Sequence, residues 1–112
     1  MQRYDLSICQ GETLRQVLRF EHPDGSAMDL SGQSGFSQVR ETPDHGTLIC
    51  QMGVLIEPEE GRVTLSIPAE TTAGITPGIY FWDFCLTDET GTRFYLGGRF
   101  HLKPAVTEVN HE

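Results

Sequence analysis

The chain has 112 residues and a formal net charge of −8, from eight basic and sixteen acidic side chains. A chain of this length forms one domain with a single core that needs no metal or disulfide support. The acidic balance, with basic residues scattered singly, argues against nucleic-acid binding, which needs clustered Lys and Arg.

Turn signals rich in Pro and Gly interrupt the chain at short intervals and separate runs of Val, Ile, Leu, Phe and Thr. The turns are HPDG (22–25), TPDHG (42–46), EPEEG (57–61), TPG (76–78) and DETG (88–91). The runs predict strands near 3–8, 13–21, 35–41, 47–52, 62–67, 79–87 and 92–102. The pattern is typical of an all-β sandwich or barrel of about seven strands.

Two further segments complete this interpretation. AETTAG (69–74) is the only stretch that favours a short helical turn. Residues 1–105 are expected to form the single β-sandwich domain, and residues 106–112 a polar C-terminal tail.

The stretch PGIYFWDFCLTDETGTRFYLGGRFHL (77–102) holds seven of the ten aromatic rings. Period-two alternation places Tyr80, Trp82, Phe84 and Leu86 on one face of a strand. A three-residue loop closed by Gly91 would pair Asp88 with Thr92. The opposed inward pairs would then be Leu86–Phe94, Phe84–Leu96, Trp82–Gly98 and Tyr80–Phe100. Most of these rings are therefore predicted to be core, and Gly98 is predicted to leave room for the indole of Trp82.

The opposite face of this hairpin supplies the candidate site. In the same register Phe81 lies opposite Arg99 and Cys85 opposite Tyr95, and Phe36 points outward from strand 35–41. Exposed aromatic rings beside Arg are typical of interface anchors. The candidate partner-binding residues are Phe36, Phe81, Asp83, Tyr95 and Arg99. The alternatives are that a second sheet or the N-terminal strand covers this face, or that the rings are isolated surface residues.

The sequence offers no constellation for catalysis. No serine lies in a GxSxG turn, and no histidine belongs to an HxH or HExxH pair. Cys9, Cys50 and Cys85 are too widely spaced to predict a disulfide framework or a zinc site. We therefore expect no enzyme activity, no metal and no cofactor. No signal segment and no span of about 18 apolar residues is present, so we expect a soluble chain without membrane insertion.

The order of the motifs resembles a family of small immunoglobulin-like β-sandwich proteins of tailed bacteriophages and prophages, similar to the N-terminal module of phage baseplate upper proteins. The resemblance covers about residues 10–107. It is carried by QGET, DGS…DLSG, GRVTLSIPAE, YFWDFCLTDETG and LGGRFHLKPAVT, in that order. It implies an antiparallel immunoglobulin-like sandwich and a virion structural role without catalytic residues. The implied partners are other virion proteins and copies of the chain itself, after synthesis in the bacterial host cytoplasm.

The chain departs from the family pattern at two neighbouring positions. Ser37 stands where the family has a larger apolar residue, and Phe36 where it has a basic one, which favours Phe36 as a contact residue. The module often begins a longer protein, whereas this chain stops at residue 112. The implied location is therefore the tail, baseplate or fibre attachment, or alternatively the head surface or neck.

Two rival functions remain from the residues alone. A carbohydrate-binding module would stack Phe81 and Tyr95 on sugar rings and use Asp83 or Arg99 for hydroxyl groups. An enzyme fragment or accessory subunit would need a concave pocket with convergent polar groups, and the sequence shows no candidate for one.

Overall fold

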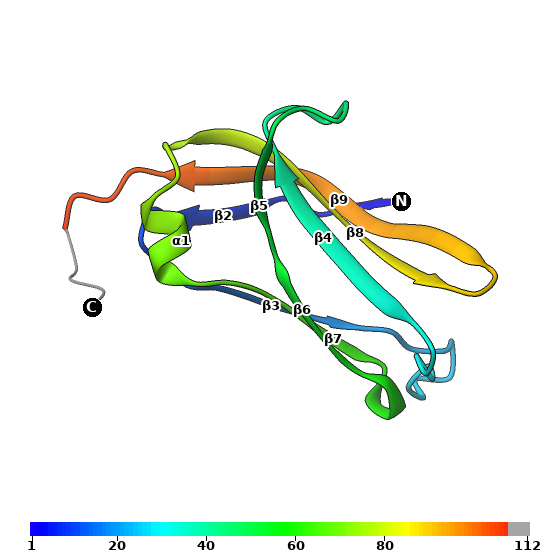
Figure 1. Ribbon diagram of the computed structural model, residues 1–112. Coiled ribbons are helices and arrows are strands. Elements are labelled where there is room, and N and C mark those ends of the chain that lie inside the picture. The colour runs from blue at the N-terminus through cyan, green and yellow to red at the C-terminus, as the bar shows by residue number, and fades with distance from the viewer. Residues whose placement is uncertain (108–112) are drawn as a thin grey trace.

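The protein is an immunoglobulin-like β-sandwich of two sheets, as shown by a computed structural model that describes residues 1–107 (Figure 1). The larger sheet has the order β1-β9-β8-β4-β5, with β2 also paired to β9. Its strands are β1 (Gln2–Arg3), β2 (Leu6–Cys9), β4 (Ser34–Arg40), β5 (Leu48–Gln51), β8 (Gly78–Asp88) and β9 (Gly91–Lys103). The smaller sheet has the order β3-β7-β6, from β3 (Leu14–Arg19), β7 (Arg62–Ile67) and β6 (Gly53–Glu57). The predicted fold class is confirmed.

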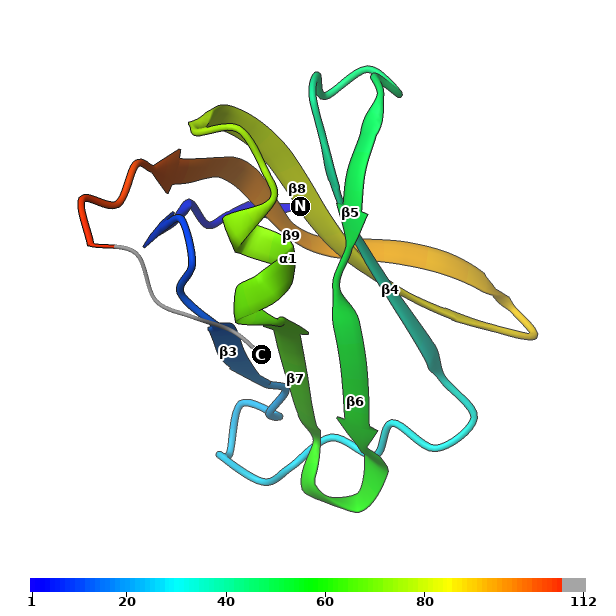
Figure 2. The ribbon, with the colours of Figure 1, turned by 60° about the vertical axis from the view of Figure 1, so that its left-hand side comes forward.

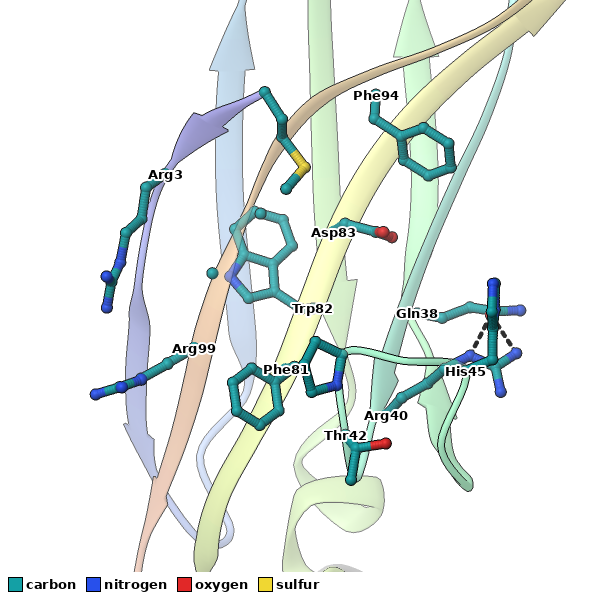
Figure 3. A pocket seen from close by; sticks show the side chains of 14 residues that line it. Arg3, Gln38, Arg40, Thr42, His45, Phe81, Trp82, Asp83, Phe94 and Arg99 are labelled. Carbon is teal, nitrogen blue, oxygen red and sulfur yellow. Dashed lines mark hydrogen bonds between the residues drawn. The ribbon is translucent and has the colours of Figure 1, made fainter.

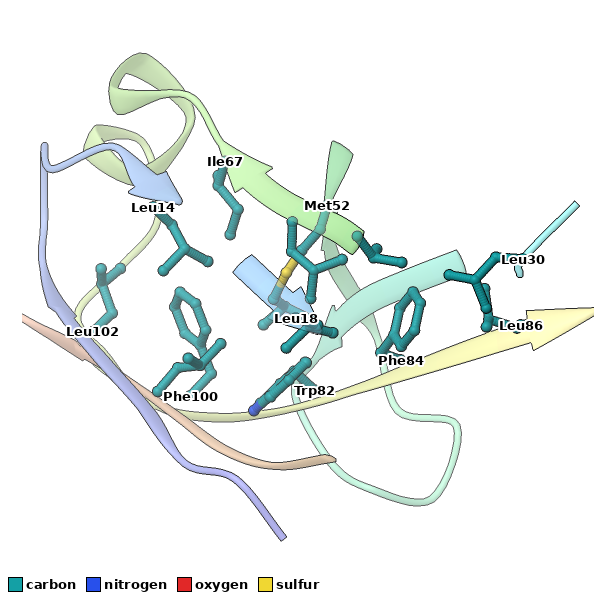
Figure 4. Close-up of a cluster of buried hydrophobic side chains, with 14 residues drawn as sticks. Leu14, Leu18, Leu30, Met52, Ile67, Trp82, Phe84, Leu86, Phe100 and Leu102 are labelled. Carbon is teal, nitrogen blue, oxygen red and sulfur yellow. The ribbon is translucent and has the colours of Figure 1, made fainter. Parts of the chain in front are cut away.

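Alternating apolar residues of both sheets form the core between the layers (Figure 4). Trp82, Phe84 and Leu86 of β8 are buried, as predicted, and they face Leu65 and Ile67 of β7. Tyr80 is only partly buried at the end of this row. The helical turn predicted near 69–74 is present as α1 (Ala69–Ala73), and a 3₁₀ turn, η1 (Pro58–Glu60), occupies the EPEEG segment.

The N-terminal strand runs parallel to β9, so the larger sheet is not purely antiparallel. It is interrupted between β1 and β2, where the backbone carbonyl of Tyr4 accepts a hydrogen bond from Trp82 Nε1 at 2.8 Å. Gly98 does lie opposite Trp82. Its purpose differs from the prediction, because a Cβ at Gly98 would meet the Asp5 carboxylate and the Tyr4 carbonyl rather than the indole. Gly98 therefore makes room for the N-terminal strand.

The β8–β9 hairpin differs from the predicted register near its loop. Asp88 pairs with Gly91 across a two-residue loop, where its carboxylate accepts hydrogen bonds from the N–H and the hydroxyl of Thr90. A bulge between Phe84 and Cys85 then restores the predicted pairs Phe84–Leu96, Trp82–Gly98 and Tyr80–Phe100. Above the bulge, Leu86 lies opposite Arg93 and Cys85 opposite Phe94, so those two predicted pairs are wrong.

The segment after residue 47 changes sheets. β5 pairs with β4 in the larger sheet, and β6 pairs with β7 in the smaller one (Figure 2). The change takes place at buried Met52, whose N–H donates to the carbonyl of Ser37 at 2.9 Å. The sequence predicts the first of these strands and misses β6.

The predicted polar tail, 106–112, falls mostly outside the described residues, which end at 107. Within residues 1–107, no helix has the length and apolar character needed to cross a membrane.

Candidate functional site: the outer face of the larger sheet

The outer face of the larger sheet, turned away from the core, is an ordered array of side chains from β4, β8 and β9. The strand register sets three neighbouring rows, which are Phe36–Cys85–Phe94, Gln38–Asp83–Gly97 and Arg40–Phe81–Arg99. We call these nine positions the outer face. Because alternate residues of a strand point to opposite sides, the same three strands supply the core and this face.

A groove of about 640 Å³ is hollowed into the outer face (Figure 3). Phe81 and Asp83 line its floor, and Phe94 stands at one end. The β4–β5 loop forms one wall, with Thr42, Pro43 and His45 against the groove. Met1 and Arg3 of the N-terminal strand form the other wall. The groove therefore joins residues from four separate parts of the chain.

The β4–β5 loop is held in place by Arg40. Its guanidinium donates to the carbonyl of Gly46 at 2.8 Å and to the amide oxygen of Gln38 at 2.8 Å. His45 takes a left-handed backbone conformation, with φ 57°, at the tip of this loop. Both acceptors of the Arg40 guanidinium are neutral, so its positive charge remains available to the groove.

The carboxylate of Asp83 is the most unusual group of the site. It is half-buried in the groove, and among residues 1–107 it has neither a hydrogen bond nor an ion pair. Burial raises the pKa of Asp83 above its ordinary value, and the positive charges of Arg40 and His45 only partly oppose this rise. A carboxyl group in this state can accept hydrogen bonds from a ligand that fills the groove.

The raised pKa of Asp83 predicts a pH-dependent stability difference. The folded protein holds the proton of Asp83 more tightly than the unfolded chain does, in which the pKa of an Asp is 3.8. The unfolding free energy of the wild type therefore falls as the pH rises above 3.8 and the Asp83 side chain loses its proton. Asp83→Asn has no proton to lose. We therefore expect the unfolding free energy of Asp83→Asn to rise relative to that of the wild type between about pH 3 and about pH 7. Urea denaturation at both pH values measures this difference, and a constant difference would contradict the burial of the charge.

Four of the five predicted site residues lie on the outer face. Phe36 is 50% exposed, Phe81 and Asp83 are half-buried, and Arg99 is exposed. Phe81 lies opposite Arg99, as predicted. The smaller sheet packs on the other side of β8, so it does not cover this face.

Tyr95 was predicted on the outer face, and this is wrong. The β9 bulge turns Tyr95 toward the interior, where its ring packs edge-on against Phe20 with the ring centres 5.1 Å apart. Phe94, predicted as core, takes the outer position and is 51% exposed. The sequence also missed Arg40 and His45. The TPDHG turn marked the loop, but nothing in the sequence placed it beside Asp83.

Comparison with known proteins gives a likeness of fold. No family model and no curated protein matches the chain. CopC from Methylosinus trichosporium OB3b is 15% identical over 94% of this chain and 89% of its own, with a TM-score of 0.53. InlP from Listeria monocytogenes is 15% identical over 91% of this chain and 26% of its own, with a TM-score of 0.45. The NK cell receptor Nkp44 is 13% identical over 93% of this chain and 97% of its own, with a TM-score of 0.44. At 15% identity, the likeness to CopC concerns the β fold alone.

Proposed function

We propose that this chain is a non-enzymatic structural protein of a bacteriophage particle that binds another virion protein through the outer face of its larger sheet. The observation that carries the proposal is the groove, which joins exposed rings, arginines and an unpaired carboxylate on a face that the smaller sheet leaves uncovered. Such a mixture of rings and Arg around a desolvated centre is typical of protein interfaces.

The energetics of the outer face favour a protein partner. Phe36 and Phe94 flank Cys85 and leave about half of each ring in water. Covering the exposed half of each ring contributes about 1 kcal/mol, since full burial of a Phe is worth about 1.5–3 kcal/mol. Arg99 has no ion pair among residues 1–107, so its guanidinium can bond to a partner.

Support for the virion role comes from the sequence resemblance and not from the structural neighbours. The resembling family acts in the tail, baseplate or fibre attachment, and the same kind of module serves as a head-decoration or neck protein. The partners in this proposal are other virion proteins and further copies of the chain, and its location is the virion.

The side-chain hydrogen bonds support the non-enzymatic part of the proposal. Over residues 1–107, no His side chain is hydrogen-bonded to a Ser, Thr or Cys that it could activate. In the same range, no group of three His, Cys, Asp or Glu residues could hold a metal ion. Both observations agree with a groove that serves recognition.

Phe94→Ala and Phe36→Ala are expected to fold like the wild type and to be incorporated into particles several-fold less well, because each removes an exposed ring. The measurement is the copy number of the chain in purified particles of the phage or prophage that encodes it, by quantitative mass spectrometry. Val17→Ala is the control. Val17 lies on β3, on the side of the smaller sheet that is turned away from the core, and its variant should be incorporated normally. If both variants fold and reach the wild-type copy number, the outer face is not the surface that binds the virion partner. If purified particles do not contain the chain, the virion role is refuted.

A carbohydrate-binding module is the second candidate, because the groove sets Asp83, Gln38 and Arg99 beside the rings of Phe81 and Phe94. Sugar sites combine a ring for stacking with planar polar groups for the hydroxyls. Calorimetric titration with oligosaccharides separates the two functions. Saturable binding that Asp83→Asn abolishes would favour the sugar, whereas the virion proposal expects no saturable binding.

A further inference from the structure

The free edge of β6 is uncharged from Gly53 to Ile56 and regular along its length, and these two features together distinguish it from the other strand edges of residues 1–107. From Gly46 to Ile56 the chain contains no charged residue, although its overall charge is −8. β6 pairs with β7 through five consecutive residues without a bulge. Among residues 1–107, β7 is the only strand that pairs with it. Leu55, at its centre, is 61% exposed.

The other edges carry the features that prevent pairing with a foreign strand. β3 has exposed Arg15 and Arg19. In β2 the N–H of Cys9 is already bonded to the carboxylate of Glu12 at 2.5 Å, and β1 has only two residues. β5 pairs with only three residues of β4, and a bulge interrupts that pairing. Among the strands of residues 1–107, only β6 therefore combines a regular backbone with a neutral, apolar edge that no such feature protects.

We propose that β6 pairs antiparallel with β6 of a second copy of this chain, which joins two three-stranded sheets into one of six strands. Since a monomer must guard such an edge and an assembled subunit need not, this inference rests on the proposed role in assembly. The inference adds to that role the surface through which two copies bind, the edge of β6, and their relative orientation, which is antiparallel.

The arrangement of residues along β6 suits a two-fold axis at Leu55. An antiparallel pair centred there sets Leu55 of one copy beside Leu55 of the other, which buries both exposed side chains. Glu57 then lies opposite Gly53 of the second copy, so the carboxylates do not meet. The carboxylate of Glu57 is also bonded within its own subunit, to Arg62 at 2.7 Å. A neutral strip that meets itself avoids the repulsion that the net charge of −8 imposes elsewhere.

The test is sedimentation velocity of the full chain over a wide concentration range. We expect a reversible dimer that tightens as salt screens the two negative subunits. Leu55→Lys places two like charges at the axis and should raise the dimer dissociation constant about tenfold or more. Leu48→Lys puts the same charge on the edge of β5 and should leave the constant unchanged, which distinguishes the two neutral edges. Thermal unfolding of each variant checks that the fold is retained.

A wild-type chain that stays monomeric at every concentration, or a dimer that Leu55→Lys does not weaken, would overturn the inference. If the chain is monomeric but Leu55→Lys still lowers its incorporation into particles, the β6 edge pairs with a different protein. That result too would overturn pairing between copies. None of these outcomes decides whether the outer face of the larger sheet binds another virion protein, which is tested separately by Phe94→Ala and Phe36→Ala.

Discussion

Phe84→Ala is expected to lower the free energy of unfolding by about 3–5 kcal/mol, the usual cost of removing a buried aromatic ring from a core. The Phe84 side chain is fully buried, and its ring packs against that of Phe20 with the centres 6.2 Å apart. The ring also borders Gly35, where the two sheets approach closely. The surrounding strands are hydrogen-bonded on both sides and cannot collapse into the space left behind.

Phe36→Ala is the matched control for this experiment. Phe36 lies one position before Ser37, which pairs with Phe84, but it points to the outer face and is half-exposed. Its replacement should change the unfolding free energy by about 0.5 kcal/mol or less. Urea denaturation of both variants measures the contrast. Equal losses would contradict the difference in burial between the two rings, and a larger loss for Phe36→Ala would mean that the two faces of the larger sheet are exchanged.

Gly61→Ala is expected to cost about 3 kcal/mol, from two effects that add. Gly61 has φ 60°, a left-handed conformation that costs a residue with a Cβ about 1–2 kcal/mol. A Cβ at this position would also lie 2.6 Å from the carbonyl oxygen of Phe20 and 2.8 Å from that of Met28. Both are backbone atoms, so the conflict is relieved only by moving two chain segments, which adds about 1–3 kcal/mol.

Gly32→Ala separates the two effects. Gly32 has φ 79°, but nothing lies within 4 Å of a Cβ built on it. Only the backbone term applies there, so we expect a loss of about 1–2 kcal/mol. Thermal or urea unfolding of both variants gives the difference, and equal losses would show that the segments around Gly61 adapt without cost.

The alternation of apolar residues was enough to predict the fold class and most of the core. Trp82, Phe84 and Leu86 lie inside because side chains alternate between the two faces of a strand. A shift of one residue would move all three from the core to the solvent face. The change of sheets at Met52 could not be predicted in this way. The apolar residues before and after Met52 are buried in different layers, but the sequence pattern of such a run predicts a single strand.

The candidate site was predicted as far as the register of the hairpin was right. Phe81 and Asp83 depend only on the parity of β8, so their place on the outer face follows from the sequence. Tyr95 and Phe94 depend on the loop and on a bulge, and one extra residue exchanges their faces. Whether the loop would use two residues or three depended on the hydrogen bonds that Thr90 donates to the Asp88 carboxylate. The sequence DETG is compatible with a loop of two residues and with one of three.

The parallel pairing of the N-terminal strand with β9 has a practical consequence for handling the protein. This pairing brings Met1 beside Gly97, where it forms part of the groove wall. An affinity tag or fusion partner joined ahead of Met1 would leave the chain at the mouth of the groove and obstruct it. Binding and particle assays therefore call for a label placed after the last strand, because an amino-terminal one would itself mimic the loss of the site.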